Sequence, residues 1–146
     1  MSCVEPIETA VIPVAETRRE ALQLPKGLLG FEEIKDYVLI SNPDEEPFSW
    51  LQVEGNASLA FVVMDPFIAL PDYQPDIPQG DVEFLKLKRP EDATLFCIVT
   101  IAENKPPTVN LKGPIVVNRH THTAKQVIIA NAAAYAVQHP LPVAAE

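Results

Sequence analysis

Short runs of β-prone residues, each ended by a turn-forming cluster, are the feature that most restricts the fold of this sequence. Tyr37–Ile40 is followed by the turn cluster Ser41–Asp44. Phe48–Val53 and Leu59–Met64 are joined by Glu54-Gly55-Asn56, where glycine tolerates a positive φ. The 15 prolines, which lack a backbone donor, keep such runs short. This pattern predicts an antiparallel hairpin within a mainly β protein.

The second half continues the same pattern. Thr94–Ile101 is apolar on both faces, which predicts a central strand covered on both sides, with Cys97 as a buried, reduced thiol. Shorter strands are expected at Thr108–Lys112, Pro114–Asn118 and Lys125–Ala130, with a loop from Arg119 to Ala124 between the last two.

Two segments have helical character. In Asp81–Leu87, Val82 and Leu85 stand three residues apart, which favours one or two helical turns. Ala130–Val137 has helix propensity but is too short to form a helix without docking.

The expected fold class is therefore all-β in the main: a small antiparallel β-barrel or sandwich of about seven to nine strands with one or two short helical turns. A chain of 146 residues fits a single domain, residues 1–146.

Nothing in the sequence predicts export or membrane insertion. The first thirty residues contain no basic start followed by an apolar stretch. No apolar run approaches the roughly 18 to 20 residues needed to span a bilayer. We therefore expect a cytoplasmic protein that does not enter a membrane.

Charge is distributed unevenly along the chain. The net charge is −9, yet residues 36–85 contain ten acidic residues and no Lys or Arg, whereas residues 86–146 carry a net +3. An acidic field repels nucleic acid and attracts basic partners. Direct nucleic-acid binding is therefore not expected. For any single acid, solubility is the simpler explanation, but for the whole block a basic partner competes with it.

Motifs for catalysis or for cofactors are absent. The sequence contains no phosphate-binding glycine loop and no metal-binding motif, so no cofactor is expected. His120-Thr121-His122 has metal-ligand spacing, but it falls in a predicted loop without cysteine, which favours a solvated turn. Asp65, Asp72 and Asp76 supply the carboxylates for an alternative hypothesis, a small β-barrel hydrolase that uses two of these aspartates. Their spacing is not diagnostic, so we do not expect an enzyme.

An ordered series of motifs extends over residues 24–141. The series consists of Gly27-Leu28-Leu29-Gly30-Phe31-Glu32, Phe48-Ser49-Trp50-Leu51-Gln52, Phe61-Val62-Val63 leading to Asp65-Pro66, Asp72-Tyr73, Val109-Asn110-Leu111-Lys112-Gly113-Pro114-Ile115-Val116-Val117-Asn118 and Gln126-Val127-Ile128-Ile129. This series resembles the FliW family of flagellar assembly factors. The ordered combination, and not any single motif, carries the resemblance. Leu24, Leu29 and Val53 stand where the family usually has Phe, Pro and Ser. Residues 1–20 are only weakly similar to the family, so their strand pairing stays open.

The resemblance implies a protein antagonist without catalytic activity. Such proteins bind the RNA-binding translational regulator CsrA away from its RNA surface and weaken RNA binding allosterically, which relieves repression of flagellin mRNA. Flagellin is the alternative, chaperone-like partner and competes for the same factor. An acidic surface suits a basic RNA-binding partner.

Candidate partner-facing residues come from the acidic block. They are Asp44, Glu45, Glu46, Asp65, Asp72, Tyr73 and Asp76. Tyr73 lies between two of these acids, where an aromatic ring either anchors the loop, the favoured role, or contacts a partner. The aromatic residues Phe48, Trp50, Phe61 and Phe96 are expected in the core. Five residues are expected to form turns: Gly27, Gly30, Gly113, Pro114 and Asn118.

Overall fold

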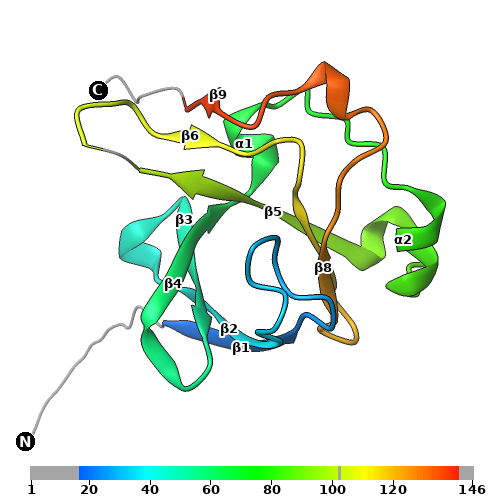
Figure 1. Ribbon diagram of the computed structural model, residues 1–146, viewed down its shortest axis with the longest axis horizontal. Helices are drawn as coiled ribbons and strands as arrows, with labels where there is room; N and C mark the ends of the chain where they lie inside the picture. The colour runs from blue at the N-terminus through cyan, green and yellow to red at the C-terminus, as the bar shows by residue number, and fades with distance from the viewer. Residues whose placement is uncertain (1–16, 102, 142–146) are drawn as a thin grey trace, which may run out of the picture.

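Nine strands form one antiparallel sheet in the computed structural model, which describes residues 17–101 and 103–141 (Figure 1). The strands are β1 Arg18–Gln23, β2 Asp36–Ser41, β3 Phe48–Val53, β4 Asn56–Met64, β5 Ala93–Thr100, β6 Thr108–Val109, β7 Ile115–Asn118, β8 Ala124–Gln126 and β9 His139–Pro140. The helical turns are η1 Pro43–Glu45, α1 Pro66–Ala69, α2 Gln79–Phe84, η2 Pro90–Asp92 and η3 Ala132–Ala134. The predicted fold class is confirmed. None of the helices among the described residues is long and apolar enough to cross a membrane.

The first four strands form a meander. Strands β1 to β4 pair antiparallel in chain order, and β3 and β4 form the predicted hairpin. Gly55 adopts a φ of 84° in its turn, which an L side chain rarely tolerates. β1 was not anticipated as a strand, because its sequence RREALQ shows no apolar alternation, and in the structure only Leu22 of its six residues is buried.

Strand β5 occupies the centre of the sheet. It pairs with β4 on one edge and with both β6 and β7 on the other. Phe96 and Ile98 pack against one hydrophobic cluster, whereas Cys97 and Val99 belong to a second cluster on the opposite face. The prediction of a central strand covered on both sides is confirmed.

The sheet curls but does not close into a barrel. The two ends of the curl, β1 and the β7–β8 hairpin, meet at a single isolated bridge between Gln23 and Thr123. The Gln23 amide donates to the His122 carbonyl at 3.0 Å, and no ladder continues from there along the described part of β1. One end of the sheet, where β1, β3 and β5 begin, is consequently lined by side chains from several strands.

Two predicted strands are shorter than expected. The strand expected over Thr108–Lys112 stops at Val109, because the Asn110 side chain accepts hydrogen bonds from the amides of Lys112 and Gly113 and forms a turn. The strand expected over Lys125–Ala130 ends at Gln126, and the Ala130 amide donates to Asp76 in a distant loop. The helical segment expected over Asp81–Leu87 is α2, which instead spans Gln79–Phe84, and the alanine-rich segment forms only the short η3.

Cys97, a residue of β5, is fully buried, as predicted. Burial, and secondarily the negative charge of Asp65, raises the pKa of its thiol to about 12. Because the thiolate is the reactive species, we expect iodoacetamide at about pH 8 to leave Cys97 unmodified in the folded protein and to label it fully in guanidinium chloride. Peptide mass spectrometry checks this. Labelling at equal rates in both conditions would contradict the burial of this thiol.

Candidate functional site

The acids of the β2–β3 connection form one exposed group. Asp44, Glu45 and Glu46 lie in or directly after η1, and the side chain of Asn42, the residue before η1, caps the turn by accepting from the Asp44 amide. All three side chains are exposed. Glu45 accepts a hydrogen bond from the indole nitrogen of Trp50 at 3.0 Å. The sequence interpretation of Trp50 as a core residue was wrong, because this residue lies on the outer face of β3 and is 37% exposed.

Asp65 joins this group from a distant part of the chain. Its carboxylate caps α1 by accepting from the Phe67 amide at 2.8 Å, yet the side chain stays exposed. Asp65 and Glu46 line the same open hollow of about 860 Å³, together with Ile68 and Phe48. We name it the acidic hollow. The fold therefore brings two of the candidate acids to one concave surface.

The other candidate residues lie elsewhere, on the loop between α1 and α2. Asp72 and Asp76 are exposed, but Tyr73 is only 2% exposed, so its assignment as a partner-facing residue is corrected. Its hydroxyl donates to the buried Leu111 carbonyl at 2.6 Å, and its ring packs edge-on against Tyr135. Burial raises the pKa of Tyr73. Tyr73 anchors the loop, which is the role that the sequence favoured.

Backbone hydrogen bonds hold this loop against the C-terminal segment. The Asp76 amide donates to Asn131 Oδ1 at 2.8 Å, and the Asp76 carbonyl accepts from the Ala130 amide at 2.7 Å. The Gln74 amide donates to the Tyr135 hydroxyl at 2.9 Å. The exposed carboxylates of Asp72 and Asp76 are therefore presented from an ordered loop. Sequence reasoning missed Asn131 and Tyr135, because they stand in an alanine-rich stretch without a recognisable motif.

A second hollow, of about 410 Å³, lies beside the acidic one and has the opposite charge. Its lining includes Arg18, Glu20, Arg119, His120 and His122, and we name it the basic hollow. The sequence analysis did not anticipate it. Arg18 and Arg119 stand at opposite ends of the sequence, and only the curl of the sheet brings β1 next to the end of β7.

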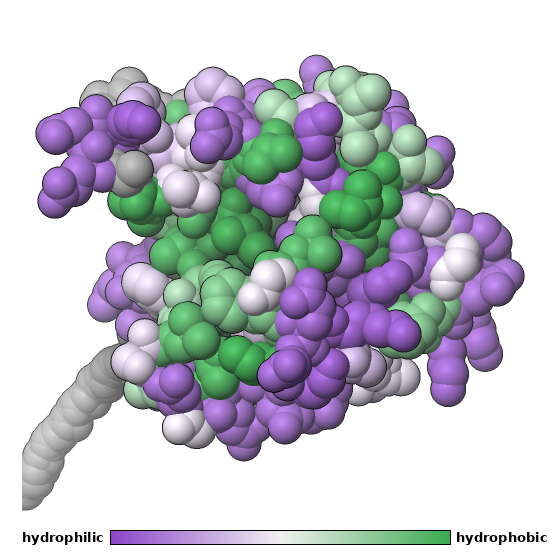
Figure 2. All heavy atoms as spheres, viewed as in Figure 1, coloured by the Kyte–Doolittle hydropathy of each residue, from purple (hydrophilic) through white to green (hydrophobic). Residues whose placement is uncertain are grey.

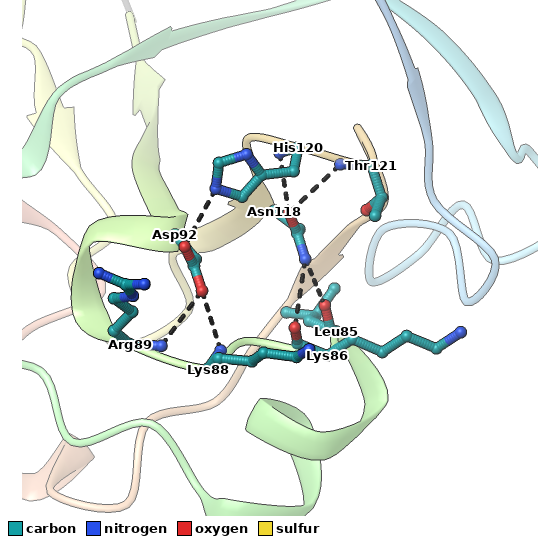
Figure 3. A network of polar contacts seen from close by, with 8 residues as sticks. All are labelled: Leu85, Lys86, Lys88, Arg89, Asp92, Asn118, His120 and Thr121. Atoms are coloured by element: carbon teal, nitrogen blue, oxygen red, sulfur yellow. Dashed lines mark hydrogen bonds and ion pairs between the residues drawn. The ribbon is translucent and has the colours of Figure 1, made fainter.

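A polar network fixes the turn on one side of the basic hollow (Figure 3). Asn118, only 3% exposed, donates to the Leu85 carbonyl at 2.8 Å and accepts from the His120 amide at 2.8 Å. Asp92 accepts from the amides of Lys88 and Arg89 and contacts His120 Nε2 at 3.0 Å. These bonds, with the Lys88 amide first and the His120 side chain next among the favourable contacts, hold the pKa of Asp92 below its usual range. The predicted turn-forming role of Asn118 is confirmed.

Apolar side chains also gather on the surface. Figure 2 shows a hydrophobic area in the middle of one face, over β4 and β5, with hydrophilic residues around its rim. The exposed residues Leu29 and Phe31, from the loop after β1, and Ile101, after β5, are 59%, 36% and 67% exposed. The Phe31 ring packs edge-on against Phe61 of β4, with 5.2 Å between the ring centroids. These residues supply exposed apolar contact area.

The geometry gives no support to the hydrolase alternative. That chemistry needs two carboxylates facing one pocket, one of them desolvated. Asp65, Asp72 and Asp76 are all exposed, and Asp65 lies in the acidic hollow whereas the other two lie on the separate loop. His120 and His122 lie in the β7–β8 turn, and across residues 17–101 and 103–141 no group of three metal-ligating side chains is found.

Comparisons with known proteins agree on one family. The family model described as FliW protein matches residues 7–141. The flagellar assembly factor FliW of Alkaliphilus metalliredigens is 38% identical over 114 residues, which cover 77% of this chain and 70% of that protein. The FliW of Bdellovibrio bacteriovorus is 38% identical over 125 residues, covering 84% and 71%. A crystal structure of the flagellar assembly factor FliW has a TM-score of 0.74 at 34% identity, covering 82% of this chain and 84% of that one. The chain therefore belongs to the FliW protein family.

Proposed function

We propose that this protein is a flagellar assembly factor that acts in the cytoplasm by binding proteins and has no catalytic activity. Its two partners are a CsrA-type translational regulator and flagellin. The observation that carries this proposal is the match to the FliW family over residues 7–141, with relatives named as flagellar assembly factors. Neither a cofactor nor nucleic acid takes part in the proposed binding.

The exposed acids support a basic partner. Six of the candidate side chains are exposed and negatively charged: Asp44, Glu45, Glu46, Asp65, Asp72 and Asp76. An RNA-binding regulator carries Lys and Arg, which such a surface attracts over long range. Because η1 and the α1–α2 loop are both fastened by hydrogen bonds, little ordering entropy is lost when a partner binds.

The proposed mechanism is stoichiometric and reciprocal. This protein binds the regulator away from the RNA-binding surface of the regulator. Its binding lowers the affinity of the regulator for flagellin mRNA, so the mRNA becomes free for translation. By linkage, RNA must weaken the affinity of the regulator for this protein by the same factor. Flagellin competes for the assembly factor, so secretion of flagellin releases the factor to bind the regulator.

Isothermal titration of the full-length protein with CsrA from the same organism tests this proposal. We expect binding near one to one, abolished when the protein is first saturated with flagellin. Repeating the titration with RNA-loaded CsrA is expected to show weaker binding. The absence of heat with both partners, at two temperatures and low salt, would overturn the proposed partners.

Charge reversal separates the α1–α2 loop from the rest of the acidic surface. We expect Asp72→Lys with Asp76→Lys to slow association with CsrA by about tenfold and to reduce its salt dependence, because fewer charges steer the encounter. Stopped-flow mixing over a salt series measures both quantities. The matched control is Glu54→Lys, an exposed acid at the β3–β4 turn. Identical kinetics in the folded double variant and in the wild type would remove this loop from the interface.

A further inference from the structure

The acidic and basic hollows are two parts of one depression at the end of the sheet. Arg18, Ser41 and Phe96 line both hollows. They come from the start of β1, the end of β2 and the first half of β5. We name the combined depression the mouth. The sheet is open beside β1, where a single bridge joins β1 to the turn before β8. No continuous ladder of backbone hydrogen bonds therefore closes the mouth on that side.

The two ends of the mouth carry opposite charges. Glu46 and Asp65 line one end, with Asp44 and Glu45 next to it in η1. Arg119 and two histidines line the other end, where Glu20 is the acidic residue, and Arg18 lies between the two ends because it lines both hollows. The two ion pairs found among the described residues are His120–Asp92 and Lys125–Asp81, and neither involves these arginines. Both guanidinium groups therefore keep donors for an incoming carboxylate.

The floor between the charged ends is apolar with one polar pair. Leu39, Phe96 and Val117 contribute the apolar surface. The Ser41 and Ser49 hydroxyl oxygens lie 3.0 Å apart and offer a donor and an acceptor to a peptide backbone. The lining of the mouth is therefore acidic at one end, apolar in the middle and basic at the other end.

We propose that the mouth binds a short segment of a protein partner with the complementary order of side chains: basic, apolar and acidic. The acidic side chain pairs with Arg18 and Arg119, the apolar one packs on Phe96, and the basic one lies near Glu46 and Asp65. Hollows of about 860 and 410 Å³ are large enough for several side chains. Nucleic acid does not fit, because Glu46 and Asp65 would repel its phosphates. The inference rests on the proposed function in one respect, that the partner is a protein.

Selection of displayed random nonapeptides on the immobilised full-length protein tests the mouth without assuming any partner. We expect the enriched peptides to share one charge order, with a basic and an acidic residue on either side of an apolar residue. The most enriched peptide, named the selected peptide, is then synthesised with a fluorescein label, and its affinity for the protein is measured by fluorescence anisotropy. We expect Arg119→Glu to weaken it at least tenfold, and Lys105→Glu, an exposed base that lines neither hollow, to leave it unchanged.

A charge swap distinguishes direct pairing from a general disturbance of the fold. Changing the acid of the peptide to lysine is expected to abolish binding to the wild type and to restore it to Arg119→Glu, which a merely unfolded variant cannot do. At the other end, Asp65→Asn keeps the cap of α1 and is expected to weaken only peptides with a basic residue. No shared charge order, or equal affinity for wild type and Arg119→Glu, would overturn the proposal.

Two rival occupants are also outcomes of this experiment. Inorganic phosphate that displaces the peptide, when sodium chloride of equal ionic strength does not, would reduce the basic end to a site for a small anion. The first sixteen residues of this chain contain three acids and no base. A synthetic peptide of residues 1–16 is tested as a competitor of the selected peptide. If it competes and binds Arg119→Glu more weakly than the wild type, the mouth binds a segment of this same chain and the partner proposal is wrong. Failure of CsrA and flagellin to bind would leave the peptide result standing, so the two proposals fail separately.

Discussion

Replacement of Gly27 by alanine is expected to lower the free energy of unfolding by about 2–5 kcal/mol, enough to unfold a marginally stable domain. Gly27 has a φ of 67°, where an L side chain is strained. A β-carbon there would lie 2.6 Å from the Phe31 carbonyl oxygen and 2.6 Å from Glu32 Cα. Backbone atoms cannot turn aside as a flexible side chain can, so the loop itself must shift.

The consequence of that shift extends beyond the loop. The loop places Leu28, which is 1% exposed, in the main core cluster. The Leu29 amide in this loop also donates to Oε1 of the buried Gln126 side chain at 2.9 Å. This hydrogen bond joins the loop to the end of β8. Urea unfolding followed by the fluorescence of Trp50, the one tryptophan, measures the loss of stability.

Gly30→Ala is the matched control for this prediction. Gly30 has a φ of 89°, but a β-carbon there meets nothing within 4 Å. Its replacement is expected to cost only the strain of the left-handed backbone, about 1–2 kcal/mol. Equal losses at the two positions would show that the close approach of the backbone at Gly27 does not matter.

Truncation of Tyr73 to alanine is expected to lower the free energy of unfolding by about 3–5 kcal/mol, because a buried aromatic ring is removed and a cavity is left. The ring lies 4.8 Å from the Tyr135 ring and 5.7 Å from the Phe67 ring, centroid to centroid. Tyr73→Phe keeps the ring but leaves the Leu111 carbonyl without its 2.6 Å donor. That change alone is expected to cost about 1–3 kcal/mol.

Tyr37 provides the matched control. It is fully buried like Tyr73, but its hydroxyl has no hydrogen-bond partner among the described residues. Tyr37→Phe removes a desolvated polar group and is expected to leave stability unchanged or to raise it by up to about 1 kcal/mol. Urea unfolding of both variants gives the comparison, and a larger loss for Tyr37→Phe than for Tyr73→Phe would contradict the hydrogen-bond assignment.

The Tyr73 variants also connect stability to binding. Since Tyr73 holds the loop that carries Asp72 and Asp76, Tyr73→Ala is expected to loosen this loop and to weaken partner binding more than Tyr73→Phe does. The two aspartates keep their charges in both variants. A difference in affinity would therefore report the order of the loop and not its charge.

The sequence alone determined which segments are strands wherever local patterns are strong. The β3–β4 hairpin followed from two β-prone runs and Gly55, and the central position of β5 followed from its apolar residues on both faces. The exposure of the six candidate acids in residues 44–76 also followed from the sequence, because a charged side chain without a partner is costly to bury. These properties depend on residues close together in the chain.

Only the tertiary structure decided what depends on distant residues. β1 is a strand because β2 pairs with it, although its own sequence lacks alternation. β8 ends at Gln126 because Pro114 stands opposite the next residue, Val127: it accepts from the Val127 amide but has no amide hydrogen to donate back. Tyr73 is buried because the Leu111 carbonyl lies within reach of its hydroxyl.

The charge order of the mouth was equally beyond sequence reasoning. Arg18 and Arg119 share one hollow, and Glu46 and Asp65 share the next, only because the sheet curls. Side-chain periodicity encodes whether a segment forms a strand and which of its faces is apolar. It does not encode how far the sheet curls or which strand ends meet, because these depend on the summed packing of the whole core.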